Sequence, residues 1–156
     1  MRRSRLSERS MTRSGAESHR LVLDTSAYSH LRAGHERVLD LVTAAEIVFL
    51  PTIVLGELEA GFALGGRERA NRTLLSEFLT EPFVSVLPVT LTVAHHYGRI
   101  FASLRRAGTP IPVNDIWIAA TALDCGGHLL SFDGDFKRVP FLECTVLKLE
   151  ESPGSR

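Results

Sequence analysis

The stretch "LVLDTSAY", residues 21–28, places three apolar residues directly before an aspartate and two hydroxyl side chains. Leu21 to Leu23 have the composition of a short buried strand. An acid directly after such a strand stands at the carboxyl end of a parallel sheet, where open α/β folds bind their ligands. Asp24 is therefore either a turn residue before the next helix or the first member of a site that distant residues complete.

Other apolar runs of similar length follow, and segments with helical periodicity separate them. The expected strands are residues 20–23, 46–50, 83–87, 128–131 and 144–149. The expected helices are residues 26–44 (a pair broken near Gly34), 51–64, 67–80, 90–107 and 115–125. Pro51 is expected as a first helical residue and Asn114 as an N-cap. This alternation predicts a three-layer α/β/α sandwich with a central, mainly parallel sheet of about five strands.

Size and composition indicate a soluble, single-domain protein. A chain of 156 residues suits one domain, and its 44% hydrophobic content is ordinary for a globular fold. Two cysteines, Cys125 and Cys144, are too few for a disulfide framework and favour a reducing compartment. The longest apolar stretch, residues 47–58, contains a proline, a glycine and a glutamate and is too short to cross a bilayer. We therefore expect a cytoplasmic protein.

The net charge of zero conceals an uneven distribution. Residues 1–20 contain six of the 18 basic and two of the 18 acidic residues, which leaves the rest of the chain with a net charge of −4. We expect residues 1–19 to form a flexible basic tail without a secretory signal, residues 20–150 the folded domain, and residues 151–156 a short tail. The acidic surplus of the domain argues against broad nonspecific binding of nucleic acid.

Five acids occupy positions that this fold would bring to one end of the sheet: Asp24, Glu57, Asp115, Asp133 and Asp135. Asp24 follows the first strand, and the two aspartates of "LLSFDGDF" follow the fourth. Asp115 opens the helix before the fourth strand, and Glu57 lies two turns into the helix after the second. Crowded carboxylates raise one another's pKa unless a cation lies between them. Oxygen-only ligands suit Mg²⁺ or Mn²⁺, which serve phosphodiester hydrolysis.

Each acid taken alone has a simpler interpretation. Asp24 could be a turn or N-cap residue, and Asp115 could be a charge that favours the start of its helix. Glu57 could be a solvated neighbour of Glu59, and the sequence Asp-Gly-Asp is common in turns. Only the joint placement of the acids is specific.

In these segments the chain resembles the PIN-domain family, and within it the VapC-type ribonuclease toxins of bacterial toxin–antitoxin modules. The segments "LVLDTSAY", "LPTIVLGELEAGF", "PVNDIWIAATAL" and "LLSFDGDF" occur in the family's order across roughly residues 20–150. The resemblance implies a Mg²⁺- or Mn²⁺-dependent endoribonuclease that hydrolyses RNA phosphodiester bonds. It also implies a small cognate antitoxin as partner, and a homodimer.

The resemblance further implies roles for individual residues. Direct metal contacts fall on Asp24, Asp115, Glu57 and Asp133, and Asp135 replaces or supports Asp133. The small polar residue that the family places beside its first acid falls on Thr25 or Ser26, and the polar neighbour of its third acid falls on Asn114. The carboxylates would orient the attacking water and accept its proton.

Two alternative functions stay open, and the residues argue against a third. A housekeeping RNA-processing nuclease would share the site but lack an antitoxin, and a catalytically silent module would bind RNA or protein through the same fold. An aspartate-nucleophile phosphatase would need a second aspartate two positions after Asp24, where the chain has Ser26. Six arginines are candidates for phosphate contacts: Arg32, Arg67, Arg69, Arg72, Arg105 and Arg106.

Overall fold

The computed structural model describes residues 19–149. The predictions of a basic N-terminal tail and of a C-terminal tail from residue 151 lie outside these residues, apart from His19. Five strands form one sheet: β1 (Arg20–Leu23), β2 (Ile47–Pro51), β3 (Val84–Leu87), β4 (His128–Ser131) and β5 (Cys144–Val146). Every pairing is parallel, and the strand order is β3-β2-β1-β4-β5. The predicted parallel five-stranded sheet is confirmed.

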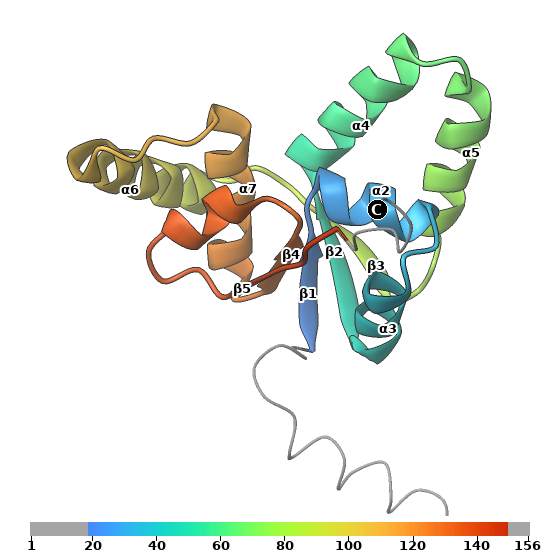
Figure 1. Ribbon diagram of the computed structural model, residues 1–156, viewed down its shortest axis with the longest axis horizontal. Helices are drawn as coiled ribbons and strands as arrows, with labels where there is room; N and C mark the ends of the chain where they lie inside the picture. Colours follow the sequence, from blue (N-terminus) through green and yellow to red (C-terminus); the bar gives the residue numbers. More distant parts are fainter. Residues whose placement is uncertain (1–18, 150–156) are drawn as a thin grey trace, which may run out of the picture.

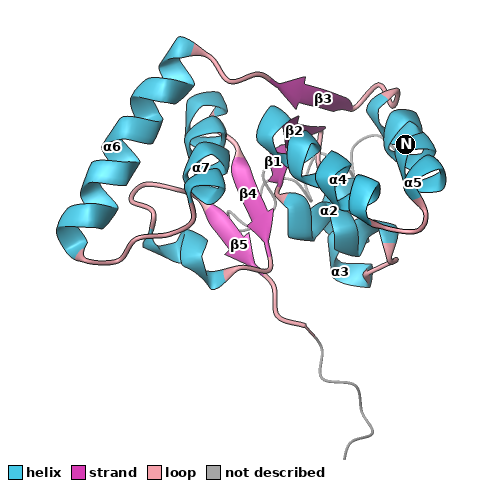
Figure 2. Ribbon diagram, turned by 90° about the horizontal axis from the view of Figure 1, so that it is seen from above, coloured by secondary structure: helices cyan, strands magenta, loops and turns pink. Residues whose placement is uncertain are grey.

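Helices cover both faces of this sheet. Within the described residues they are α2 (Thr25–Arg32), α3 (Glu36–Ala44), α4 (Thr52–Leu64), α5 (Glu68–Leu79), α6 (Leu91–Ala107) and α7 (Val113–Cys125). Helices α6 and α7 lie on one side of the sheet, and α2 to α5 lie on the other (Figures 1 and 2). The three-layer arrangement predicted from the alternating pattern is therefore confirmed.

The central strands are the most apolar part of the fold. Leu21, Val22 and Leu23 are at most 2% exposed, and all four residues of β4 are buried. A strand that carries helices on both faces has no solvent side, so its apolar residues run consecutively. This explains why β1 and β4 could be located from the sequence to the residue.

Two predicted helix starts are wrong. Pro51 is the last residue of β2 and the N-cap of α4, because its φ of −61° and ψ of 144° are extended. Helix α7 begins at Val113 with Pro112 as its N-cap, and Asn114 lies in its first turn. The carbonyl of Pro112 already accepts the first helical hydrogen bond, from the amide of Ile116, so the helix starts before Asn114 can cap it.

The last part of the chain also differs from the prediction. Strand β5 ends at Val146, although the apolar run continues to Leu149. A short 3₁₀ helix, η1 (Gly134–Arg138), occupies a segment for which the sequence predicted neither a helix nor a strand. Asp133 caps this helix, since its carboxylate accepts a hydrogen bond from the amide of Asp135 at 2.9 Å.

The topology determines where a ligand can bind. The chain moves from β1 to β2 to β3 through α2–α5, then crosses back through α6 and α7 to β4 on the other side of β1. The strand order thus reverses between β1 and β4. Open α/β folds bind their ligands outside the carboxyl ends of the strands at such a reversal. Leu23 pairs with Leu130 in the register, so Asp24, the residue after β1, lies beside Ser131, the last residue of β4.

Candidate metal centre

Asp24 is a buried carboxylate at the end of β1, 5% exposed. Its Oδ1 accepts hydrogen bonds from the amide of Ala27 at 2.8 Å and from Ser26 Oγ at 2.7 Å. Its Oδ2 accepts one from Ser131 Oγ at 2.5 Å. Asp24 is thus the N-cap of α2, as its simpler interpretation held. About four acceptor positions exist on a carboxylate, so Oδ2 keeps one for a further ligand.

Burial raises the pKa of Asp24, and the negative charge of Asp133 raises it further. The hydrogen bonds from Ser131, Ala27 and Ser26 lower it, because they stabilise the charged form. The hydrogen-bond donors therefore stabilise the charged form of Asp24, and the negative charge of Asp133 destabilises it.

Ser131 connects two of the acids, a role that we did not predict from the sequence. Its side chain is fully buried, and its Oγ donates to Asp24 and accepts from the amide of Asp133 at 2.9 Å. The signal was a hydroxyl at the end of a predicted strand. It could be interpreted only with the pairing of β1 and β4, which places Ser131 beside Asp24.

The predicted polar neighbours divide into two groups. Ser26 Oγ donates to Asp24 and accepts from the amide of Phe132 at 3.1 Å, and Thr25 Oγ1 donates to Glu57 Oε1 at 2.8 Å. Adjacent residues of α2 therefore hold two different acids. Asn114 is exposed and makes no side-chain hydrogen bond to any part of residues 19–149. Asn114 therefore does not contact the acids directly.

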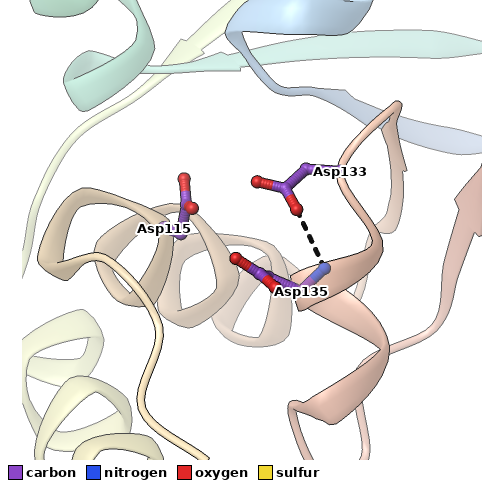
Figure 3. Close-up of side chains that lie close together, drawn as sticks. All are labelled: Asp115, Asp133 and Asp135. Atoms are coloured by element: carbon purple, nitrogen blue, oxygen red, sulfur yellow. Dashed lines mark hydrogen bonds between the residues drawn. The ribbon is translucent and has the colours of Figure 1, made fainter.

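Asp115, Asp133 and Asp135 come together from two elements. Asp115 lies in the first turn of α7, Asp133 caps η1, and Asp135 lies in the first turn of η1. One carboxylate oxygen of each lies within 4.8 Å of the others, and the three groups face a common space (Figure 3). Arg138 forms an ion pair with Asp135, with 3.1 Å between Nη1 and Oδ1.

The pKa of Asp115 shows that the other four predicted acids all act on this one. Burial and repulsion raise it to about 6. After burial, the causes in order of size are the charges of Asp133, Glu57, Asp24 and Asp135. Asp24 and Glu57 stand outside the tight group of three, but they are close enough to repel Asp115.

This donor set fits a hard divalent cation. It consists of carboxylate oxygens, which Mg²⁺ and Mn²⁺ prefer. Within residues 19–149, Arg138 is the only cationic side chain in an ion pair with any of the five acids. One arginine leaves most of the negative charge uncompensated, and this charge contributes to the raised pKa of Asp115.

Three of the predicted arginine candidates have partners within the protein. Arg72 forms ion pairs with Glu59 and Glu68 at 2.9 Å each. The guanidinium of Arg32 lies over the ring of Tyr28 at 5.5 Å, and that of Arg105 lies over the ring of Phe101 at 5.3 Å. The other three, which are exposed on helices or next to them, are Arg67, Arg69 and Arg106.

Comparison with known proteins agrees with this architecture. The family model described as "PIN domain" matches residues 21–142. Ribonuclease VapC4 of Mycobacterium tuberculosis is 31% identical over 131 residues, which cover 82% of this chain and 97% of the relative.

Two solved structures have the same fold. VapBC2 from Rickettsia felis, bound to a DNA fragment from its promoter, superimposes with a TM-score of 0.75 at 22% identity and covers 83% of this chain and 99% of its own. VapBC-5 from Mycobacterium tuberculosis, a member of the VapBC family of toxin–antitoxin systems, gives a TM-score of 0.65 at 25% identity and covers 84% and 99%.

The fold and the site define a doubly wound α/β domain with a cluster of carboxylates at the reversal of its strand order. The chain belongs to the PIN domain family, in its VapC-type branch. Among the described residues, no helix combines the length and the apolar character that a bilayer crossing requires.

Proposed function

We propose that the chain is a metal-dependent endoribonuclease and the toxin component of a type II toxin–antitoxin pair. The observation that carries the proposal is the repulsion among five acids near the ends of β1 and β4, in a member of a family whose relatives include ribonucleases. We take residues 20–150 as its single nuclease domain. A cytoplasmic location and a homodimer belong to the same proposal.

Asp24, Asp115 and Asp133 are the acids that would hold Mg²⁺ or Mn²⁺ directly. Asp24 has one acceptor position left on Oδ2, which permits one ligand bond. Asp133 is favoured over Asp135 because its charge acts on both Asp24 and Asp115. Asp135 is partly neutralised by Arg138 and supports the site from its rim.

Glu57 completes the set from α4. Its Oε1 is held by Thr25, which leaves Oε2 to contact the ion, to orient the attacking water or to accept its proton. When bound, the ion supplies positive charge to the phosphate oxygens and lowers the pKa of a coordinated water. The buried hydrogen bonds of Asp24 keep the carboxylates in place for this chemistry.

The proposed partner is a small antitoxin protein that contributes a cationic side chain or a helix near the acids. The uncompensated negative charge of the site supports this proposal, because a cation placed there would relieve the repulsion on Asp115. The related VapBC-5 structure is described as a toxin–antitoxin system, which supports the same pairing here.

A cleavage assay tests the proposed activity. Purified protein is incubated with a mixed RNA in Mg²⁺ or Mn²⁺, with and without EDTA, beside Asp24→Asn and the matched control Asp40→Asn, an exposed acid of α3. We expect cleavage by the wild type and by Asp40→Asn, and none with EDTA or with Asp24→Asn. Cleavage that survives both changes would contradict the proposed site. A folded protein that cuts no RNA would favour the silent module.

Expression in a bacterial host separates a toxin from a housekeeping nuclease. If the protein is a toxin, expression of the wild type should arrest growth, and expression of Asp24→Asn should not. The arrest should end when a short neighbouring gene for a DNA-binding protein is co-expressed. A protein that cleaves RNA in solution but leaves growth unchanged would favour the housekeeping function.

A further inference from the structure

The segment that carries Asp133 is held by an aromatic ring. Phe132 stands between Ser131 and Asp133, and the ring of His30 stacks on it with 3.8 Å between centroids and 19° between planes. The ring of His35 packs against the same phenyl ring at 5.2 Å and 78°. Helix α2 and the loop after it thus hold Phe132 with two imidazoles.

His30 is connected to this segment by a second route. Its Nδ1 lies 2.8 Å from the carbonyl oxygen of Ser26, a hydrogen bond in which the ring nitrogen donates. The hydroxyl of Ser26 accepts from the amide of Phe132 and donates to Asp24. One histidine therefore contacts the β4–η1 segment directly by stacking and indirectly through the serine that also holds Asp24.

His35 stabilises the other side of the aromatic group. Its Nδ1 accepts from the amide of Val38 at 3.4 Å and caps α3, so the ring is fixed by the helix start. Its Nε2 is buried and has no hydrogen-bond partner among the described residues. The rings of His30 and His35 pack edge to face at 5.8 Å. This packing limits how far the ring of His30 can move.

The segment needs such support because its acids repel their neighbours. The charge of Asp133 is the largest electrostatic contribution to the raised pKa of Asp115, and it also raises the pKa of Asp24. Repulsion favours a movement of Asp133 away from both acids. Stacking of Phe132 on His30 and the hydrogen bonds of Ser131 and Ser26 oppose that movement.

We propose that His30 is a positioning residue, which holds Phe132 and thereby keeps Asp133 where it can bind a divalent cation together with Asp115. The inference rests on the proposed metal site and adds a residue to it. His30 does not touch the cation. It acts through Phe132, in the way that outer residues orient the ligands of metal sites.

Mn²⁺ titration by electron paramagnetic resonance, without RNA, tests this role. The variants are His30→Ala, which removes the ring, and His30→Phe, which keeps an aromatic face for the stack. His95→Ala, at an exposed histidine of α6, is the matched control. We expect His30→Ala to bind Mn²⁺ roughly tenfold more weakly than the wild type. His30→Phe should recover most of the affinity, and His95→Ala should match the wild type.

Amide hydrogen exchange gives a second readout at the segment itself. The amides of Phe132, Asp133 and Asp135 are hydrogen-bonded to Ser26 Oγ, Ser131 Oγ and Asp133 Oδ1. In His30→Ala we expect their exchange to be faster, and in His30→Phe close to that of the wild type. If His30→Ala fails to fold, His30→Leu, which keeps the volume without the aromatic face, replaces it.

Two results would overturn the inference. One is an unchanged Mn²⁺ affinity in His30→Ala with only a lower melting temperature, which would make His30 a purely structural residue. The other is a His30→Phe variant that binds Mn²⁺ as weakly as His30→Ala does. A wild type that binds no Mn²⁺ would instead remove the proposed metal site, while exchange at the three amides would still show whether His30 holds the segment.

Discussion

At the scale of single residues, Asp115 shows the cost of burying an acid close to other acids. Its pKa is about 6 in the folded protein, against the usual 3.8. The folded protein therefore binds this proton more tightly than the unfolded chain does. The contribution of this proton to stability is fully present below about pH 3.8 and is lost as the pH rises to and through about 6.

Replacement of Asp115 by Asn should remove this pH dependence. We expect metal-free Asp115→Asn to melt at a higher temperature than the wild type at pH 7, and the difference to shrink toward pH 4. Thermal denaturation in EDTA across this range measures it, with Asp40→Asn, at an exposed acid of α3, as the control. An Asp115→Asn variant that melts below the wild type at pH 7 would contradict the repulsion.

Ser131→Ala should destabilise the protein, because it removes the donor to a buried carboxylate. A hydrogen bond to a charged group contributes about 1.5–3 kcal/mol, and we expect a loss of free energy of unfolding in that range. Urea unfolding at pH 7 measures the loss, and Ser29→Ala, at an exposed serine of α2, should change it by less than about 0.5 kcal/mol. Equal effects of the two substitutions would show that Ser131 does not support Asp24.

The acids and two of their polar neighbours, Thr25 and Ser26, could be predicted from the sequence and its resemblance, but the support from Ser131 and His30 could not. Asp24, Glu57 and Asp115 each stand at a recognisable point of a strand or helix, so the expected topology alone brought them together. Ser131 depends on the register between β1 and β4, and His30 depends on a contact with Phe132, which lies far from it along the chain. No local pattern reports either contact.

At the scale of elements, the predicted boundaries were accurate for strands that are buried on both faces. They were wrong where backbone hydrogen bonds determine where a helix starts. Strand β1 ends with its apolar run at Leu23, and β4 ends one residue after its apolar pair, at Ser131. Helix α7 starts earlier than expected because the carbonyl of Pro112 accepts its first hydrogen bond. The helix η1 depends on Asp133 as its cap, which an Asp-Gly-Asp sequence permits but does not require.

The turn between α7 and β4 requires a residue without a side chain. A Cβ at Gly127 would lie 2.6 Å from Val22 Cγ2 and 2.9 Å from Cys125 Sγ, so Gly127→Ala should cost about 1–3 kcal/mol by overpacking. Gly98, within α6, has nothing within 4 Å of its Cβ position, and Gly98→Ala should stabilise the protein by roughly 0.5–1 kcal/mol. Urea unfolding measures whether the two substitutions change the free energy of unfolding in opposite directions. A change in the same direction for both would contradict this account.

At the scale of the whole molecule, the reversal of the strand order between β1 and β4 brings the residues of the site together. Helices α2 to α5 carry the chain away from β1 on one face, and α6 and α7 return it on the other. The carboxyl ends of β1 and β4 therefore meet, with the first turns of α2 and α7 beside them. Residues 107 positions apart, Asp24 and Ser131, come into hydrogen-bond contact. The sequence predicted this convergence because the rule for parallel sheets depends only on the order of elements.

The location of the cation is the most direct test of the central claim that these acids form one metal site. Crystals grown with Mn²⁺ would show it by anomalous scattering. We predict a peak bounded by carboxylate oxygens of Asp24, Asp115 and Asp133, with Asp135 toward its rim. A protein that cleaves RNA in Mn²⁺ but shows no peak among these three acids, or holds the ion elsewhere, would contradict the account.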